Sequence, residues 1–200
     1  MEPLASQMRP QTLYEFVGQA HLTGKDKPLR VAIEKKELFS FIVWGPPGSG
    51  KTTLARIYAH AVGADFYELS AVEAGKDDIR KVIGNRNSLL KQKPKILFID
   101  EIHRFNKAQQ DFLLPFVERG DITLIGATTE NPSFEVIAPL LSRCRVFVLH
   151  EHSESEMERI LKRTKLKIPK DARDWLIKMA AGDARQAITT LETAEKLYGK

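Results

Sequence analysis

Residues 39–52 read FSFIVWGPPGSGKT, an apolar run followed by a glycine-rich segment and a Lys-Thr pair. The apolar part predicts a buried strand over 39–44, and Gly45–Thr52 matches the pattern G-x-x-x-x-G-K-[S/T]. Residues 52–62 have helical spacing and end before Gly63, which supplies the strand–loop–helix context that this phosphate-binding motif requires. The stretch therefore predicts an α/β fold that binds a nucleotide.

The residue types in this loop fit phosphate chemistry. Glycines allow successive backbone N–H groups to point at phosphate oxygens, and the following helix N-terminus adds partial positive charge. Lys51 would contact the β- and γ-phosphates, and the Thr52 hydroxyl would bind Mg²⁺. ATP and Mg²⁺ are therefore the expected ligands. The candidate nucleotide-binding residues are Gly45, Pro46, Pro47, Gly48, Ser49, Gly50, Lys51, Thr52 and Thr53.

A second apolar run, 95–99, ends in the carboxylates of Asp100 and Glu101. Ligands of open α/β sheets bind at the carboxyl ends of the strands, so these side chains should emerge beside the phosphate loop. We expect Asp100 to hold Mg²⁺ through its waters and Glu101 to orient and activate the attacking water.

Apolar runs alternate with helix-like segments along the first 150 residues, which is typical of a parallel α/β sheet. Further strands are predicted over 66–69, 122–127 and 146–149, and helices over 76–91 and 106–118. After His150 the pattern becomes helical, with capping boxes beginning at Ser153 and Asp183. The expected fold class is α/β: a five-stranded parallel sheet flanked by helices over 1–150, followed by a small all-α lid domain over 151–200.

Composition limits the class of protein. The chain has 200 residues, 42% hydrophobic and 28% charged, with 31 Lys and Arg against 26 Asp and Glu, a net charge of +5. These values exclude a disordered or collagen-like chain. The single cysteine, Cys144, cannot form an internal disulfide and is expected to pack at the start of the fifth strand. Because no signal peptide or long apolar run is visible, we expect a cytoplasmic protein without membrane contact.

Residues 76–95 carry seven Lys and Arg against two Asp, a net charge of 7 − 2 = +5. Such a segment either contacts nucleic-acid phosphates or forms a solvated helix face. Arg104 and Lys107 are further candidates for DNA contact. Since no base-reading element is visible, any DNA binding should follow structure rather than sequence.

The combined pattern resembles AAA+ ATPases, and within them the clamp-loader branch. DEIHRFNKAQQD at 100–111 and GATTENPSF at 126–134 are similar to the RarA/MgsA family, the bacterial relatives of the Werner-helicase-interacting protein. Residues 9–22 resemble the adenine-side segment of that group, which adds Val17 and Gly18 to the nucleotide-binding residues. Although DEIH also resembles DEAH-type helicases, the further helicase motifs are missing from 104–200, so His103 is expected to hydrogen-bond near the site.

The resemblance implies two sensors of the γ-phosphate. Thr129 occupies the sensor-1 position at the end of the fourth strand, and Thr128 and Asn131 are alternatives. Arg185, in the first turn of the last helix, matches sensor 2 and would link the helical part to the nucleotide state.

The same resemblance implies an arginine finger. Arg143 in Ser-Arg-Cys would reach the ATP of a neighbouring subunit and stabilise charge on the transferred phosphoryl group. Arg145 is the alternative finger, and the other interpretation of Arg143 is a surface arginine before a strand.

The function implied by the resemblance is an Mg²⁺-dependent, DNA-stimulated ATPase that acts at stalled replication forks or in recombination. The expected partners are single-strand–duplex DNA junctions and proteins such as single-strand binding protein. The family oligomerises through a C-terminal region, so the full-length protein is expected to be a homo-oligomer. This chain stops at Lys200, before that region, and is expected to be a monomer. A clamp-loader subunit, a RuvB-like motor and a nucleotide-dependent switch with negligible turnover are the alternatives.

Overall fold

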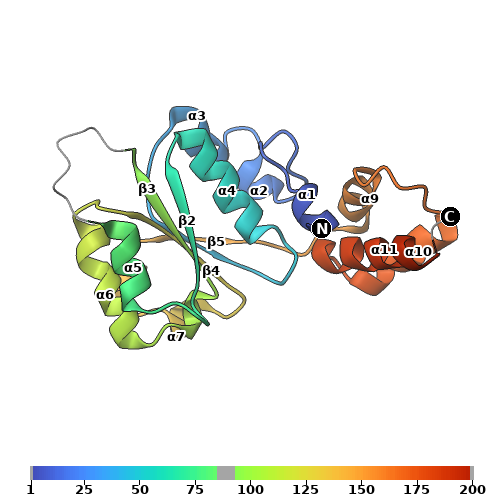
Figure 1. The fold of residues 1–200 in the computed structure, drawn as a ribbon. Helices are drawn as coiled ribbons and strands as arrows, with labels where there is room; N and C mark the ends of the chain where they lie inside the picture. Colours follow the sequence, from blue (N-terminus) through green and yellow to red (C-terminus); the bar gives the residue numbers. More distant parts are fainter. Residues whose placement is uncertain (1, 85–92, 199–200) are drawn as a thin grey trace.

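The computed structural model describes residues 2–84 and 93–198, and its centre is a parallel sheet (Figure 1). The sheet has five strands in the order β2-β3-β4-β1-β5, and every neighbouring pair is parallel. The predicted five-stranded parallel sheet is therefore confirmed. The strands are β1 (Phe41–Trp44), β2 (Asp65–Ser70), β3 (Lys95–Asp100), β4 (Thr123–Thr128) and β5 (Arg145–Val148).

Helices connect the strands and continue beyond the last one. Those before and between the strands are α1 (Leu4–Gln7), α2 (Ala20–Thr23), α3 (Pro28–Lys35), α4 (Lys51–Val62), α5 (Lys76–Ile83), the 3₁₀ turn η1 (Ile102–Arg104), α6 (Lys107–Glu118), α7 (Pro132–Glu135) and α8 (Ala138–Leu141). Those after β5 are α9 (Glu154–Lys162), α10 (Lys170–Ala180) and α11 (Ala184–Tyr198).

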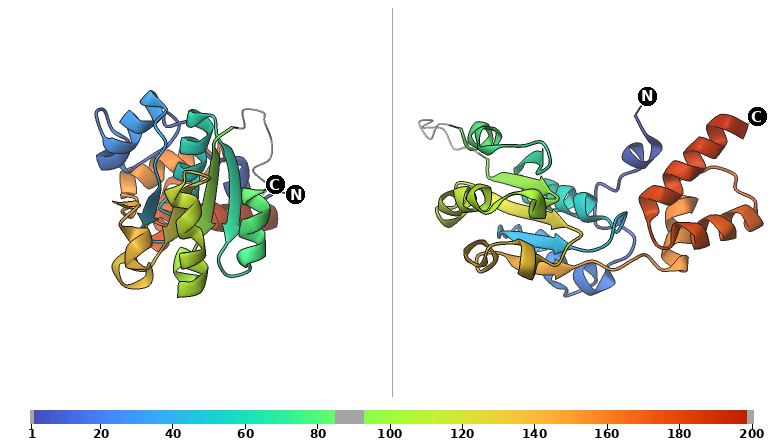
Figure 2. Two further views of the ribbon diagram at one scale, coloured as in Figure 1. Left: turned by 90° about the vertical axis from the view of Figure 1, so that its left-hand side faces the viewer. Right: turned by 90° about the horizontal axis from the view of Figure 1, so that it is seen from below.

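The central strands β1, β3 and β4 are buried on both faces, because helices cover each side of the sheet (Figure 2). Successive strand residues point to opposite faces. Phe41 and Val43 of β1 therefore join the core under α3 and α4, whereas Ile42 joins the core under α5, α6 and α8. Burial on both faces explains why the strands read as continuous apolar runs. Cys144 packs against the second core as expected, and burial raises the pKa of its thiol to about 12.

Two of the boundaries predicted above were wrong by two residues or more, and the other predicted ends of strands and helices differ from the structure by at most one residue. β1 begins at Phe41 rather than at residue 39, because the N–H of Phe39 donates to the Tyr58 hydroxyl instead of to a strand. The helix predicted over 76–91 ends at Ile83, since Gly84 adopts a φ of 65° and ends it. The rest of that prediction, 85–91, lies outside the described residues.

The short helices α1, α2, α7 and α8 were not predicted from the sequence. Each has four residues, too few for the 3.6-residue period to appear in the apolar pattern. The eight-residue helix α3, which begins at Pro28, was missed as well.

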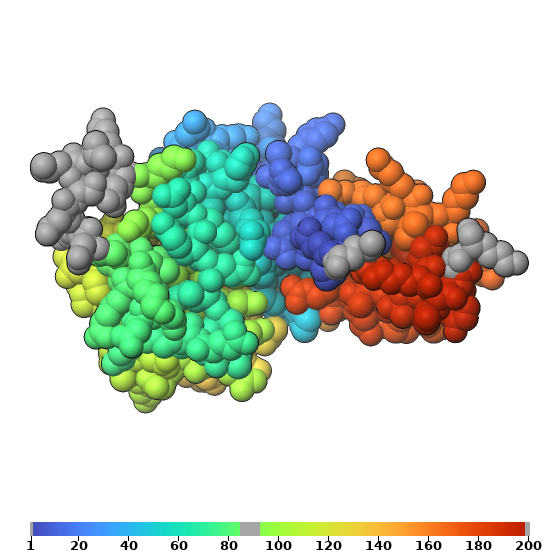
Figure 3. Space-filling model, in the orientation of Figure 1, coloured from blue at the N-terminus to red at the C-terminus, as the bar shows by residue number. Residues whose placement is uncertain are grey.

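The three helices after β5 pack around a separate apolar cluster. The Ser153 hydroxyl accepts the N–H of Glu156, and the Asp183 carboxylate accepts the N–H of Gln186 at 2.9 Å, as both predicted caps require. The N-terminal residues also lie against this group (Figure 3), where the Leu4 N–H donates to Glu192 Oε2 at 3.0 Å. The division into two domains at residue 150 stays a prediction. Within residues 2–84 and 93–198, no helix is long and apolar enough to cross a membrane.

Candidate nucleotide-binding site

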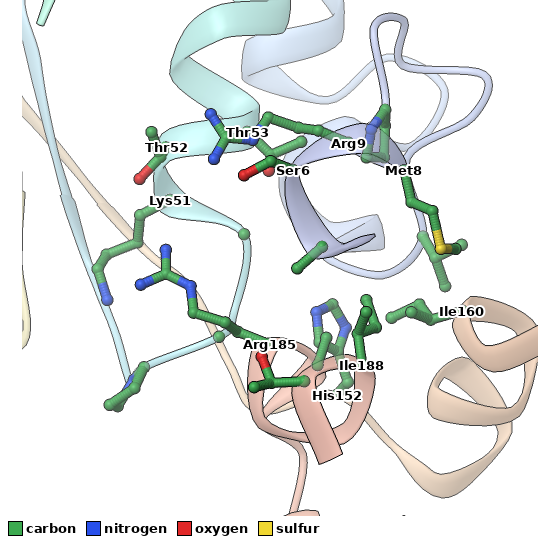
Figure 4. Close-up of a pocket in the computed structure, with 18 of the residues that line it drawn as sticks. Ser6, Met8, Arg9, Lys51, Thr52, Thr53, His152, Ile160, Arg185 and Ile188 are labelled. Atoms are coloured by element: carbon green, nitrogen blue, oxygen red, sulfur yellow. The ribbon is translucent and has the colours of Figure 1, made fainter. Parts of the chain in front are cut away.

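A cavity of about 490 Å³ lies where the phosphate loop, the N-terminal segment and the first turn of α11 meet (Figure 4). Most of the predicted site residues line it, although they come from opposite ends of the chain. The lining includes Val17, Pro47, Gly48, Gly50, Lys51, Thr52, Thr53, Asp100, Glu101, Thr129 and Arg185. The fold therefore gathers at one place the side chains that the motifs identified separately. Gly18, Gly45, Pro46 and Ser49 are not part of this lining.

The phosphate loop has the backbone conformation that its glycines permit. Gly48 and Gly50 have φ angles of 67° and 98°, in the left-handed region, and Gly50 caps α4. Lys51 follows at the start of α4 and is 8% exposed. Its ammonium donates to the carbonyls of Gly45 at 2.7 Å and Pro46 at 2.9 Å. Burial lowers the pKa of Lys51, and the carboxylates of Glu101 and Asp100 oppose that shift.

The two carboxylates leave the end of β3 in different environments. Burial, followed by the neighbouring charge of Glu101, raises the pKa of Asp100, while Lys51 and Arg185 act in the opposite direction. Glu101 has a φ of 53° and a ψ of 47°, which turns its side chain away from the strand direction. Its Oε2 accepts the Thr129 hydroxyl at 3.5 Å and lies 3.2 Å from His103 Nδ1. The expected hydrogen bonding of His103 near the site is confirmed.

The three sensor-1 candidates differ in position. Thr129 lines the cavity and donates to Glu101. Thr128 is fully buried, and its hydroxyl lies 2.9 Å from His103 Nδ1. Asn131 caps α7 by accepting the Ser133 N–H at 3.0 Å. Among these, Thr129 is the side chain that combines exposure to the cavity with contact to a carboxylate.

Arg185 extends from the first turn of α11 toward Lys51 (Figure 4). The phosphate loop and this helix are in close contact, because a Cβ placed on Gly48 would lie 1.9 Å from Asp183 Oδ1 and 2.9 Å from the Ala184 nitrogen. Only glycine at position 48 allows that approach. The helical part is thus held directly against the predicted phosphate site.

Arg143 lies outside this cavity. Its guanidinium forms an ion pair with Glu118 and donates to the carbonyl of Pro139 at 2.7 Å. Arg145, the alternative, lies over the ring of Phe39 at 6.0 Å. Neither arginine lines the cavity of its own chain.

Three residues of the site were not identified from the sequence. Gln19 donates to the carbonyls of Ser49 and His150 and accepts the His150 N–H, so it ties the phosphate loop to the segment after β5. His152 has a side chain 3% exposed, and burial lowers its pKa. Arg163 donates to the carbonyls of Glu15 and Met8, which holds the N-terminal segment over the cavity. Gln19 stands beside the Val17-Gly18 pair, but nothing in the sequence marks His152 or Arg163.

Several basic side chains of residues 76–95 have partners within the chain and are not free surface charges. Arg80 pairs with Asp77 at 2.5 Å and Lys81 pairs with Asp78 at 2.9 Å. Lys95 donates to the last carbonyls of α5. Arg86 and Lys91 lie outside the described residues, whereas Lys93, Arg104 and Lys107 are exposed.

Comparisons with known proteins agree with this geometry. The family described as "ATPase family associated with various cellular activities (AAA)" matches residues 41–151. The chain therefore belongs to the AAA ATPase family. Within it, the chain is similar to the proteins named Replication-associated recombination protein A and ATPase WRNIP1.

The recombination protein of Coxiella burnetii is 54% identical over 95% of this chain and 46% of its own length. That of Escherichia coli is 46% identical over 96% of this chain and 45% of its own length. Dictyostelium discoideum ATPase WRNIP1 is 48% identical over 97% of this chain and 23% of its own length. The chain therefore spans less than half the length of these relatives.

Among solved structures, the Thermotoga maritima RuvB Holliday junction branch migration motor superimposes with a TM-score of 0.73. It is 31% identical over 95% of this chain and 67% of that chain. The α/β architecture is thus that of a RuvB-like AAA+ core.

Proposed function

We propose that this chain binds ATP in the cavity beside the phosphate loop and hydrolyses it. The observation that carries the proposal is the convergence of Lys51, Asp100, Glu101, Thr129 and Arg185 on one cavity. Lys51 would exchange its carbonyl partners for oxygens of the β- and γ-phosphates. Glu101 would orient and deprotonate the attacking water, with Thr129 and Arg185 contacting the water or the γ-phosphate.

The residues present fit a magnesium ion. The Thr52 hydroxyl and the Asp100 carboxylate both line the cavity, and oxygen donors of this kind suit Mg²⁺. When bound, the ion would neutralise charge that develops on the phosphate oxygens. We propose that Thr52 contacts the ion directly and that Asp100 holds it through water.

We propose further that Arg143 acts on the nucleotide of a neighbouring copy. Its position outside its own cavity, together with its exposed guanidinium, supports a contact made in trans. Glu118 and Pro139 would then act as its partners in the unassembled chain. Turnover should therefore depend on the concentration of the chain.

The physiological substrate that we propose is DNA with single-strand–duplex junctions at forks or recombination intermediates. The names of the relatives support this assignment, and so does the exposure of Lys93, Arg104 and Lys107. Binding to single-strand binding protein, assembly as a homo-oligomer in the full-length protein and a cytoplasmic, nucleoid-associated location belong to the same proposal.

The test is ATP turnover per chain across a protein-concentration series, with and without junction DNA. The expected result is a rate per chain that rises with concentration and rises again with DNA. A flat rate near zero, alongside tight ATP binding, would contradict hydrolysis by this chain and favour a nucleotide-dependent switch.

A further inference from the structure

His103 lies between the carboxyl ends of β3 and β4, next to the candidate catalytic residues. It lies in η1, directly after Glu101, and its side chain is 11% exposed. One nitrogen, Nδ1, lies 3.2 Å from Glu101 Oε2 and 2.9 Å from Thr128 Oγ1. The imidazole therefore bridges the carboxylate that follows β3 and the last hydroxyl of β4.

The donors and acceptors around this nitrogen determine which atom carries the proton. Thr128 Oγ1 accepts the backbone N–H of Glu130 at 3.0 Å, and its own proton points to the Glu130 carbonyl at 3.3 Å. An ionised carboxylate can only accept, so the 3.2 Å approach of Nδ1 to Glu101 Oε2 favours a proton on Nδ1 over a bare lone pair. With its proton on Nδ1, His103 donates to Thr128 Oγ1 at 2.9 Å and presents the same N–H to Glu101 Oε2 at 3.2 Å.

The contact with His103 restricts the conformations of the Glu101 side chain. The Glu101 side chain is 34% exposed and follows a backbone in the left-handed region. His103 and Thr129 both reach Oε2, from two different elements of the chain. Within the described part of the chain, Oε1 receives no hydrogen bond, so it stays available to a water in the cavity.

We infer that His103 is a positioning residue, which orients the Glu101 carboxylate toward the attacking water by holding its Oε2. The inference rests on the role proposed above for Glu101. Thr128 completes the arrangement, because it anchors the imidazole to the buried end of β4. A misplacement of about 1 Å in a catalytic group can cost about 100-fold in rate, so loss of this partner should lower turnover by about 10- to 100-fold.

The kinetic test compares two substitutions of His103, one that removes the hydrogen-bond donor and one that keeps a donor. His103→Ala removes the donor, and we expect kcat to fall about 10- to 100-fold while the ATP dissociation constant changes less than about threefold. In His103→Asn the side-chain amide can donate from nearly the position of Nδ1, so most of the lost kcat should return. Equal losses in the two variants, or an unchanged kcat in His103→Ala, would overturn the positioning role.

A second measurement does not depend on turnover. Nitrogen NMR of the imidazole in the wild-type chain should report the Nδ1–H tautomer, and Glu101→Ala should change the Nδ1 signal. A proton on Nε2 alone, or an Nδ1 signal that ignores Glu101→Ala, would overturn the inference even if the chain hydrolyses ATP. Conversely, the expected tautomer without any turnover would leave the contact intact and refute the proposed hydrolysis.

Discussion

Gly48 is a point of close approach between the phosphate loop and the start of α11, and Gly48→Ala perturbs both elements. Its φ of 67° lies in the left-handed region, which costs a residue with a Cβ about 1–2 kcal/mol. The new Cβ would lie 1.9 Å from Asp183 Oδ1, so that carboxylate must turn away. Asp183 caps α11 through the Gln186 N–H, and losing such a cap costs about 1 kcal/mol. The expected loss in the free energy of unfolding is therefore about 2–3 kcal/mol.

Gly63→Ala is the matched control. Gly63 has a φ of 71°, but a Cβ there would meet nothing within 4 Å. Both substitutions thus carry the same backbone cost and the same gain from a less flexible unfolded chain. Any difference between them reports the contact of Gly48 with Asp183.

Urea unfolding followed by circular dichroism should place Gly48→Ala about 1 kcal/mol or more below Gly63→Ala. ATP affinity should fall in Gly48→Ala and stay at the wild-type value in Gly63→Ala. Equal destabilisation of the two variants, with wild-type ATP affinity in Gly48→Ala, would refute the close contact of the loop with α11.

Three further predictions concern single residues. Burial lowers the pKa of His152, although Glu156 opposes this. As the pH falls, the His152 imidazole therefore binds a proton at higher pH in the unfolded chain than in the folded chain. The free energy of unfolding should decrease as the pH falls from about 6.5 through the lower pKa of the folded state. Urea midpoints at pH 7.5 and 5.5 should differ less in His152→Gln, and an equal difference would contradict the buried neutral imidazole. Lys51→Ala should weaken ATP binding roughly 100-fold by calorimetric titration, because the phosphates lose a charged donor; unchanged affinity would refute the site. Arg143→Ala should retain ATP affinity but lose the concentration-dependent turnover, by about 10³-fold. Wild-type turnover per chain in that variant would exclude the finger in trans.

The parts of the site that were predicted from the sequence are those encoded by contiguous residues. The phosphate loop is a single motif in which each residue type has a chemical reason. Asp100 and Glu101 end an apolar run, and the geometry of parallel sheets brings such ends beside the loop. Arg185 was assigned from the family resemblance, and the cap at Asp183 places it in the first turn of its helix.

The contacts that join distant segments could not be predicted. Gln19 binds the carbonyl of His150, and no local pattern indicates that pairing. The choice between Thr128 and Thr129 depends on which face of β4 is turned to the cavity. That orientation follows from pairing with β1 and β3, which the sequence of one strand does not specify. The end of α5 depended on Gly84, whose positive φ stopped a pattern that continues in the sequence.

The measurement that tests the central claim most directly compares Glu101→Gln with the wild-type chain in ATP binding and in ATP turnover at high chain concentration. The substitution keeps the shape of the side chain and removes the base. The account predicts an ATP dissociation constant within about threefold of wild type and a turnover reduced roughly 100-fold or more. Turnover equal to wild type would contradict the assignment of Glu101, and with it the proposal that this cavity hydrolyses ATP.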